Sequence, residues 1–239
     1  MNGVVVHGVF DLLAWLAAAA AGLWLTRIEK IAFPAVTTDL PYLAAILLGA
    51  GLGAYVFGTA NMWLSGVPGF GRSIEGAVAG GIVAVELYKR AAGIGTRTGA
   101  RFALPLAVGV AVGRIGCYLA GLDDFTYGTP TALPWGHDFG DGVARHPVQL
   151  YEAAAMAAFA LIYVVAVRRR DRFVIDNGFY LAAGFYGAQR FGWEFLKPYA
   201  AVLGPLTLFH LLSLAILAYA IVMIATAPDR STVHDRAPA

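Results

Sequence analysis

The sequence has little cysteine and little charge, and each shortage excludes a class of protein. The single cysteine, Cys117, rules out an internal disulfide and a cysteine-rich metal site. Only 13% of the 239 residues are charged, whereas a soluble domain has about 25%. The sequence contains no P-loop and no dinucleotide-binding signature. No lysine or arginine precedes the first apolar run, so a cleaved secretory signal is not expected.

Histidines are also sparse, and their spacing is not that of a metal site. The five are scattered along the chain, at His7, His137, His146, His210 and His234. Zinc sites that can be identified from sequence have ligands at short, regular spacings. We therefore expect no metal centre, no cofactor and no nucleic-acid partner.

Long apolar runs are what the sequence has instead. Apolar side chains make up 59% of the chain, and the mean hydropathy is +0.67. Seven apolar segments can be drawn, at 4–26, 41–63, 73–92, 101–120, 147–167, 177–195 and 201–225. Each has about the 20 residues that cross a bilayer core as a helix, because lipid offers no partner to unpaired backbone groups. The sequence predicts an all-α polytopic membrane protein with about seven transmembrane helices.

The domain organisation that follows is simple. Residues 1–227 are expected to form a single transmembrane domain with a polar outer-face loop at 121–146. Residues 228–239 are polar and charged, which predicts a disordered cytoplasmic tail.

The basic residues indicate the orientation of the helices. If the N-terminus lies outside, twelve basic residues fall on the cytoplasmic side: Arg27, Lys30, Lys89, Arg90, Arg97, Arg101, Arg168, Arg169, Arg170, Arg172, Arg230 and Arg236. Five remain on the outer side: Arg72, Arg114, Arg145, Arg190 and Lys197. Because cytoplasmic loops carry the excess of lysine and arginine, this split predicts an N-out, C-in topology.

Four of the five outer-side cations are arginines at the edges of apolar segments or of the 121–146 loop. Each one alone can be explained by a side chain that reaches up to the headgroups. Charges at membrane depth are costly, however, and usually face an internal cavity and carry function. We expect Arg72, Arg114, Arg145 and Arg190 to converge on one rim.

Pairs of glycines four residues apart let helix backbones approach closely in a membrane. Packing alone explains Gly49 and Gly53. Gly76, Gly80 and Gly81 lie in a segment that also contains Glu75. For these three glycines, a smooth wall beside a cavity is as good an explanation as packing.

Acidic residues near the arginines allow two interpretations each. Arg190 and Glu194 are four residues apart on one helix face, and form either a structural ion pair or an arginine held in place to bind a phosphate. Glu75 is a partner for an arginine or a base with a pKa raised by burial. Asp123 and Asp124 form a solvated turn, anchor an arginine, or supply a base.

The segment around Pro147 opens the fifth apolar run. Proline favours the first helical position, which places His146 at the cap, as a structural residue or as a functional one. Gln149 and Glu152 then lie about one turn apart near the outer end of that helix, where the helix dipole favours a carboxylate.

Four stretches together resemble the prolipoprotein diacylglyceryl transferase family: Gly113-Arg-Ile-Gly, Tyr127-Gly-Thr-Pro, Arg145-His-Pro-Val-Gln-Leu-Tyr-Glu and Gly187-Ala-Gln-Arg-Phe-Gly-Trp-Glu. The resemblance implies a seven-helix protein of the bacterial inner membrane with its site on the outer side. It implies transfer of a diacylglyceryl group from phosphatidylglycerol to the lipobox cysteine of a prolipoprotein signal peptide, which forms a thioether and releases glycerol phosphate.

The resemblance also implies roles for individual residues. Arg114 and Arg190 match the family's two essential arginines, and Glu194 matches the carboxylate paired with the second. Asp123 or Asp124 falls near a loop glutamate of the family, and Gly128 matches a characteristic glycine.

Two positions depart from the family pattern. Cys117 stands where the family has asparagine, and Glu75 stands where it has histidine. We assign Cys117 to packing. The base that deprotonates the thiol is then Glu75, His146 or Asp124, and the residues expected to contact substrate are Arg72, Gly76, Gly80, Asp123, Gly128, Arg145, Gln149 and Glu152. The alternatives are a related lipid-group transferase with another acceptor, or a non-catalytic lipid-binding or transport protein on the same fold.

Overall fold

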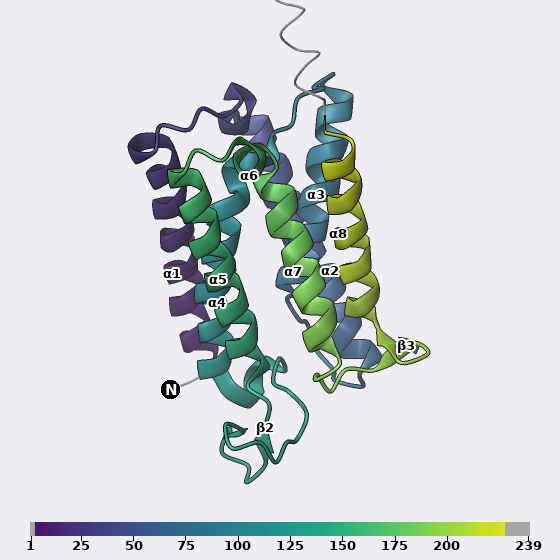
Figure 1. Ribbon diagram of the computed structural model, residues 1–239. Helices are drawn as coiled ribbons and strands as arrows, with labels where there is room; N and C mark the ends of the chain where they lie inside the picture. The colour runs from purple at the N-terminus through teal and green to yellow at the C-terminus, as the bar shows by residue number, and fades with distance from the viewer. Residues whose placement is uncertain (1–2, 228–239) are drawn as a thin grey trace, which may run out of the picture.

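The computed structural model describes residues 3–227, and this part of the chain is an all-α bundle (Figure 1). Its long helices are α1 (Gly3–Leu23), α2 (Leu40–Leu64), α3 (Ile74–Ala91), α4 (Ala103–Ala120), α5 (Val148–Arg168), α7 (Gly178–Glu194) and α8 (Leu208–Ala225). The short helices are η1 (Trp24–Ile28), η2 (Ala35–Thr38), η3 (Gly99–Phe102), η4 (Gly121–Asp124) and α6 (Arg172–Asp176). Two small hairpins pair β1 (His137–Asp138) with β2 (Ala144–Arg145) and β3 (Ala201–Leu203) with β4 (Leu206–Thr207).

Each predicted apolar segment contains one long helix, and the last one differs at its start. The segment 201–225 was expected to be helical throughout, but residues 201–207 form the β3–β4 hairpin. Gly204 turns the chain with a φ of 55°. Thr207 then caps α8 by accepting from the backbone N–H of His210, while the His210 ring accepts from the backbone of Thr207 at 3.0 Å. The tail predicted at 228–239 lies outside the described residues.

The surface of the bundle is suited to lipid. In residues 3–227, five helical segments are long and apolar enough to cross a membrane: Val5–Ile28, Leu40–Leu64, Gly99–Asp124, Val148–Arg168 and Leu208–Ala225. Large apolar side chains point outward, as with Leu48 at 74% and Ile162 at 68% exposure. Helices α3 and α7 are absent from this set and contain Glu75, Arg190 and Glu194. The chain is a polytopic membrane protein, and a count of seven crossings stays a prediction.

The helices pack as neighbouring pairs. Helix α1 packs on α4, α4 on α5, α2 on α3 and α7 on α8, while α7 also contacts α4 and α5. Figure 1 shows that the start of α1, the β1–β2 loop and the β3–β4 hairpin lie at one end of the bundle, which we call the loop end. Helices α3 and α5 begin at the loop end, and α4 and α7 finish there. Side chains near these four helix ends therefore meet.

Glycines set the close contact between α2 and α3. Gly49 and Gly53 of α2 lie against Gly76 and Gly80 of α3, and a Cβ added at Gly80 would lie 2.9 Å from the Cα of Gly53. The packing interpretation of Gly49 and Gly53 is confirmed. Gly76 and Gly80 belong to the same contact, so the packing alternative holds for them, whereas Gly81 lines a cavity, as the other alternative predicted.

We expect Gly80→Ala to destabilise the protein, because the added methyl group meets the α2 backbone and overpacking costs about 1–3 kcal/mol. Gly51→Ala is the matched control on α2, since nothing lies within 4 Å of a Cβ there. Thermal unfolding of both variants in detergent would measure the difference. Equal unfolding midpoints would show that the glycine contact does not hold α2 on α3.

Candidate active site

Arg190 is the centre of a buried group of charges. Its side chain is 2% exposed, and it faces carboxylates from three helices. Nε donates to Glu75 at 3.0 Å, a terminal nitrogen donates to Glu152 at 2.5 Å, and the other lies 2.9 Å from Glu194. The predicted Arg190–Glu194 pair is confirmed. A guanidinium taken out of water needs such partners, since an unpaired buried charge is strongly destabilising.

Glu152 joins Arg190 to two further cations. Its side chain is fully buried, and its second oxygen contacts Nε of Arg114. Lys197 places Nζ 2.9 Å from the oxygen that also meets Arg190. We call these six side chains the ionic cluster: Glu75, Arg114, Glu152, Arg190, Glu194 and Lys197. With three positive and three negative groups, the ionic cluster has no net charge when all are ionised.

Local structure explains how each helix end places its carboxylate. Ser73 caps α3 by accepting from the Gly76 N–H at 3.1 Å, which leaves Glu75 in the first turn, where the helix dipole favours a negative charge. Ser213 of α8 donates to Glu75 at 2.6 Å. On the other side Thr207, the cap of α8, donates to Glu194 at 2.7 Å. Each of these two carboxylates is therefore fixed by an arginine and by a hydroxyl.

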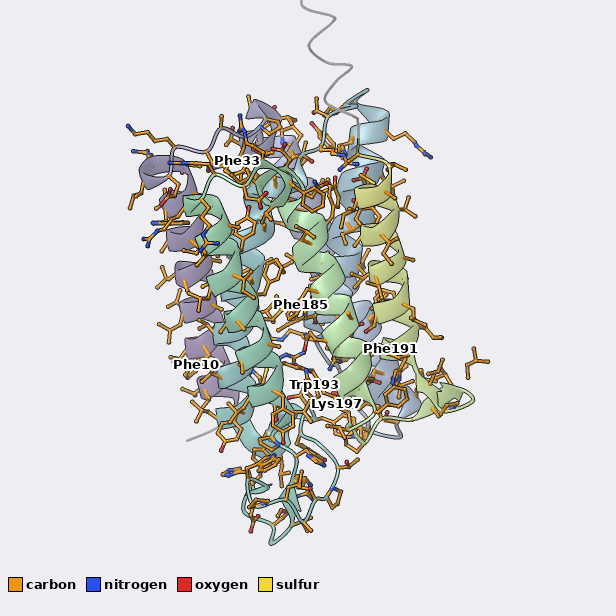
Figure 2. All side chains as sticks on the ribbon, viewed as in Figure 1. Phe10, Phe33, Phe185, Phe191, Trp193 and Lys197 are labelled. Atoms are coloured by element: carbon orange, nitrogen blue, oxygen red, sulfur yellow. The ribbon has the colours of Figure 1, made fainter. Side chains whose placement is uncertain are left out.

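Several buried donors around the ionic cluster have no aligned hydrogen-bond partner. Nε of Arg114 and Nζ of Lys197 lie at ion-pair distance from Glu152 without hydrogen-bond alignment. Further unpartnered polar atoms belong to Gln149, Tyr186, Gln189 and Trp193. Figure 2 shows Trp193 and Lys197 between the loop-end halves of α5 and α7. A buried polar group without a partner costs about 1–3 kcal/mol, so this region has the donors to receive a ligand rich in acceptor oxygens.

Two of the four predicted arginines lie outside the ionic cluster. Arg72 pairs with Asp11 of α1 at 3.1 Å and is half exposed. Arg145 donates two hydrogen bonds of 2.7 Å to Asp141, within the turn between β1 and β2. The Arg145 guanidinium lowers the pKa of Asp141 by these bonds. The expectation that all four arginines converge is wrong, because nearer carboxylates hold Arg72 and Arg145.

His146 and Gly128 fasten the loop to the start of α5. Gly128 donates its N–H to the His146 carbonyl at 3.0 Å, and a Cβ at Gly128 would lie 2.6 Å from that of His146. Only glycine fits so close an approach. The His146 ring lies 3.4 Å from the Tyr151 hydroxyl. Pro147 is the cap residue itself, so its expected place as the first helical residue is wrong by one position.

Within residues 3–227, the acidic pair after α4 forms no ion pair with an arginine. Asp124 lies 2.5 Å from the His7 ring, and Asp123 lies against Gly3 at the start of α1. Cys117 is buried as expected, with its sulfur 3.9 Å from Arg114. It also approaches His7 and Asp124, whose ligand atoms all fall within 4.8 Å of one another. Distance along the chain was therefore a poor guide to whether His7 belongs to a cluster.

An apolar cavity adjoins the ionic cluster. It has a volume of about 370 Å³, and helices α1, α2, α3 and α4 form most of its wall. The wall includes Ile74 and Gly113, the residues directly before Glu75 and Arg114. Arg114 and Arg190 are not part of the wall itself. The arrangement places a space suited to hydrocarbon beside buried groups suited to an anion.

Lys197 is the member of the ionic cluster whose role could not be predicted from the sequence. It follows α7, in the connection to the β3–β4 hairpin, and is fully buried. Burial, followed by the positive charge of Arg190, lowers its pKa to about 8. The only feature of the sequence that pointed to Lys197 is that it is one of the five basic residues on the predicted outer side.

We expect Glu152→Gln to lower the free energy of unfolding by about 3–5 kcal/mol, because it removes the carboxylate shared by Arg114, Arg190 and Lys197. Asp141→Asn is the control, since it breaks an ion pair that is open to solvent and weakened by water. Denaturant unfolding in detergent would compare the two. A Glu152→Gln protein as stable as the control would contradict the shared role of this carboxylate.

Comparison with known proteins gives a consistent picture. The model of a family described as prolipoprotein diacylglyceryl transferase matches residues 3–226. A Geobacter sulfurreducens protein named phosphatidylglycerol–prolipoprotein diacylglyceryl transferase is 35% identical over 181 residues, which cover 70% of this chain and 68% of that protein. A Methylococcus capsulatus protein of the same name is 33% identical over 216 residues, which cover 82% of this chain and 80% of that protein.

Proposed function

Because the chain belongs to the prolipoprotein diacylglyceryl transferase family, we propose that it transfers the diacylglyceryl group of phosphatidylglycerol to a prolipoprotein. We propose further that the acceptor is the lipobox cysteine thiol, and that the site opens to the outer side of the bacterial inner membrane in the N-out, C-in topology. The observation that carries the proposal is the pairing of Arg114 and Arg190 through Glu152 beside an apolar cavity.

The reaction replaces a carbon–oxygen bond by a carbon–sulfur bond. The sulfur attacks the glycerol carbon that bears the phosphate, and the bond from that carbon to the phosphate oxygen breaks. Its electron pair leaves with glycerol phosphate, and the thiol gives its proton to a base. The phosphate changes from one negative charge to two, so groups that bind the second charge accelerate the step.

Arg114 is the residue proposed to bind the phosphate. A guanidinium has five N–H groups. Arg190 directs all three of its nitrogens to carboxylates. Arg114 meets Glu152 through Nε, and its terminal nitrogens contact no carboxylate in the described part of the chain, since Nη1 donates only a long bond to the Cys117 sulfur. Two parallel charge-assisted hydrogen bonds suit a phosphate. Arg190 holds Glu152 in position and supports the site with its remaining N–H groups.

Lys197 is the proposed proton acceptor. Glu75 already accepts a hydrogen bond on each carboxylate oxygen, one from Arg190 and one from Ser213, so neither oxygen is free to face the thiol. His146 faces Tyr151, and Asp124 faces His7. Lys197 lies within the ionic cluster, and its pKa of about 8 is close to that of a free cysteine, about 8.5. A base whose pKa lies near the working pH is the most effective.

The apolar cavity is the proposed site of the acyl chains. Its wall includes side chains such as Ile46, Ile82 and Leu106, which offer no hydrogen bonds to a headgroup. Ile74 and Gly113 of the cavity wall directly precede Glu75 and Arg114 in the chain. With the acyl chains in the cavity, the phosphate would therefore lie near Arg114. Gln149, buried with an unpaired amide one turn before Glu152, is the proposed additional contact to the headgroup.

We expect Arg114→Lys to reduce diacylglyceryl transfer by about 100–1000-fold, because lysine keeps the charge but loses the paired donors. Formation of the thioether on a lipobox peptide from labelled phosphatidylglycerol would measure it. Arg168→Lys is the control, because Arg168 lies exposed at the opposite end of α5. Normal turnover of the Arg114→Lys variant would refute the proposed role of Arg114 in phosphate binding. If the unsubstituted protein binds phosphatidylglycerol but transfers nothing, a non-catalytic function would be favoured instead.

The proposed base predicts a pH dependence. Below pH 8 Lys197 is protonated and cannot accept another proton, so turnover should rise as the pH passes through about 8. Lys197→Arg keeps a positive charge beside Glu152 but stays protonated. We expect the turnover of this variant to be lower by about 100-fold or more at neutral pH. Its turnover should increase only at the pH at which the substrate thiol itself ionises. Unchanged turnover of Lys197→Arg at neutral pH would exclude Lys197 as the base.

A further inference from the structure

Three side chains with metal-binding atoms meet outside the ionic cluster, at the loop end. His7 comes from the first turns of α1, Cys117 from the last turn of α4, and Asp124 from the end of η4. Their ligand atoms all lie within 4.8 Å of one another. Nε2 of His7 is 2.5 Å from Oδ1 of Asp124, and the two side chains are 20% and 11% exposed. Cys117 is buried beneath them.

We propose that His7, Cys117 and Asp124 form a binding site for a divalent ion of the zinc class. An imidazole nitrogen, a thiolate and a carboxylate oxygen are the three kinds of ligand that zinc takes in proteins. Tetrahedral coordination at about 2.0–2.3 Å places ligand atoms roughly 3.3–3.8 Å apart. The His7–Asp124 separation of 2.5 Å is shorter than this range, and no separation exceeds 4.8 Å, so side-chain movements of about 1 Å would admit the ion. Three protein ligands leave the fourth position to water or to another small ligand.

The surroundings of Asp124 support this assignment. Its Oδ2 accepts a hydrogen bond from the Thr126 hydroxyl, which holds the carboxylate with Oδ1 turned toward His7. Such partners of metal ligands fix the orientation of the ligand. Arg114 donates a long hydrogen bond of 3.9 Å to the sulfur, and Arg114 is itself paired with Glu152. An ionised Cys117 together with Asp124 would balance the two charges of the ion.

The proposed ion would connect parts of the chain that are far apart in sequence. It would join the start of α1 to the end of α4 and to the first residues of the outer loop. Metal binding to a folded site adds to stability, because the unfolded chain does not present the ligands together. The proposal concerns metal binding itself and does not depend on the transferase reaction.

Cobalt(II) is a suitable probe, because a thiolate bound to it gives a near-ultraviolet charge-transfer band. The full chain, purified in detergent without a histidine tag, is titrated with cobalt(II), and zinc is then added as a competitor. We expect one ion per chain, a thiolate band that zinc removes, and a higher unfolding temperature with zinc. Cys117→Ser should abolish the band, and His7→Ala and Asp124→Asn should weaken binding.

Further variants separate a metal site from a general effect on folding. Thr126→Val keeps all three ligands and should weaken binding by about 10–100-fold. His137→Ala and His146→Ala are the histidine controls and should bind as the unsubstituted chain does. Absence of the band in the unsubstituted chain, or its persistence in Cys117→Ser, would overturn the proposal. Equal loss of the zinc-induced stabilisation in the histidine controls would also overturn it.

Discussion

The burial of Arg190 is the constraint on which the interior of this protein depends. A guanidinium at 2% exposure in a protein that is mostly hydrocarbon requires carboxylates, and no single helix can supply them all. Glu75 comes from α3, Glu152 from α5 and Glu194 from α7 itself. The loop ends of these helices must meet around one side chain. Glycine contacts between α2 and α3 and the apolar core between α1, α4 and α5 then complete the bundle.

The same pairing prepares the site for chemistry. Groups aligned before the substrate arrives do not have to reorganise as charge develops, and this preorganisation is the main source of electrostatic catalysis. Arg190 has a carboxylate at each of its nitrogens. The terminal nitrogens of Arg114 meet only the Cys117 sulfur, and Nζ of Lys197 has no aligned hydrogen bond among the described residues. In the proposed site, Arg190 and the three carboxylates hold the arrangement, while Arg114 and Lys197 face the ligand.

Hydropathy was enough to predict where the long helices lie, but it did not predict where each of them begins or ends. The segment 201–225 looked apolar throughout, but a turn at Gly204 and the cap at Thr207 delay the helix to Leu208. The i,i+4 spacing was enough to predict the pairing of Arg190 with Glu194. The shared role of Glu152 and the place of Lys197 depend on which helix ends meet, and spacing in a sequence carries no such information.

Long-range neighbours account for the other differences. Arg72 and Arg145 looked equivalent to Arg114 as arginines at segment edges, yet Asp11 and Asp141 bind them first. His7 is more than a hundred residues from Cys117 and Asp124 in the chain, and contact between α1 and α4 brings them together. A pattern of single residues can list the charged groups of a membrane protein, but the packing of helices selects their partners.

The equal numbers of acids and bases in the ionic cluster also bear on turnover. A site with surplus positive charge would bind a doubly charged phosphate ester strongly and would release it slowly. Here the charges of the six ionised side chains sum to zero. Individual N–H donors therefore attract the departing headgroup, but the cluster as a whole has no net positive charge to retain it. In the proposed mechanism, this neutrality would let glycerol phosphate leave before a new lipid binds.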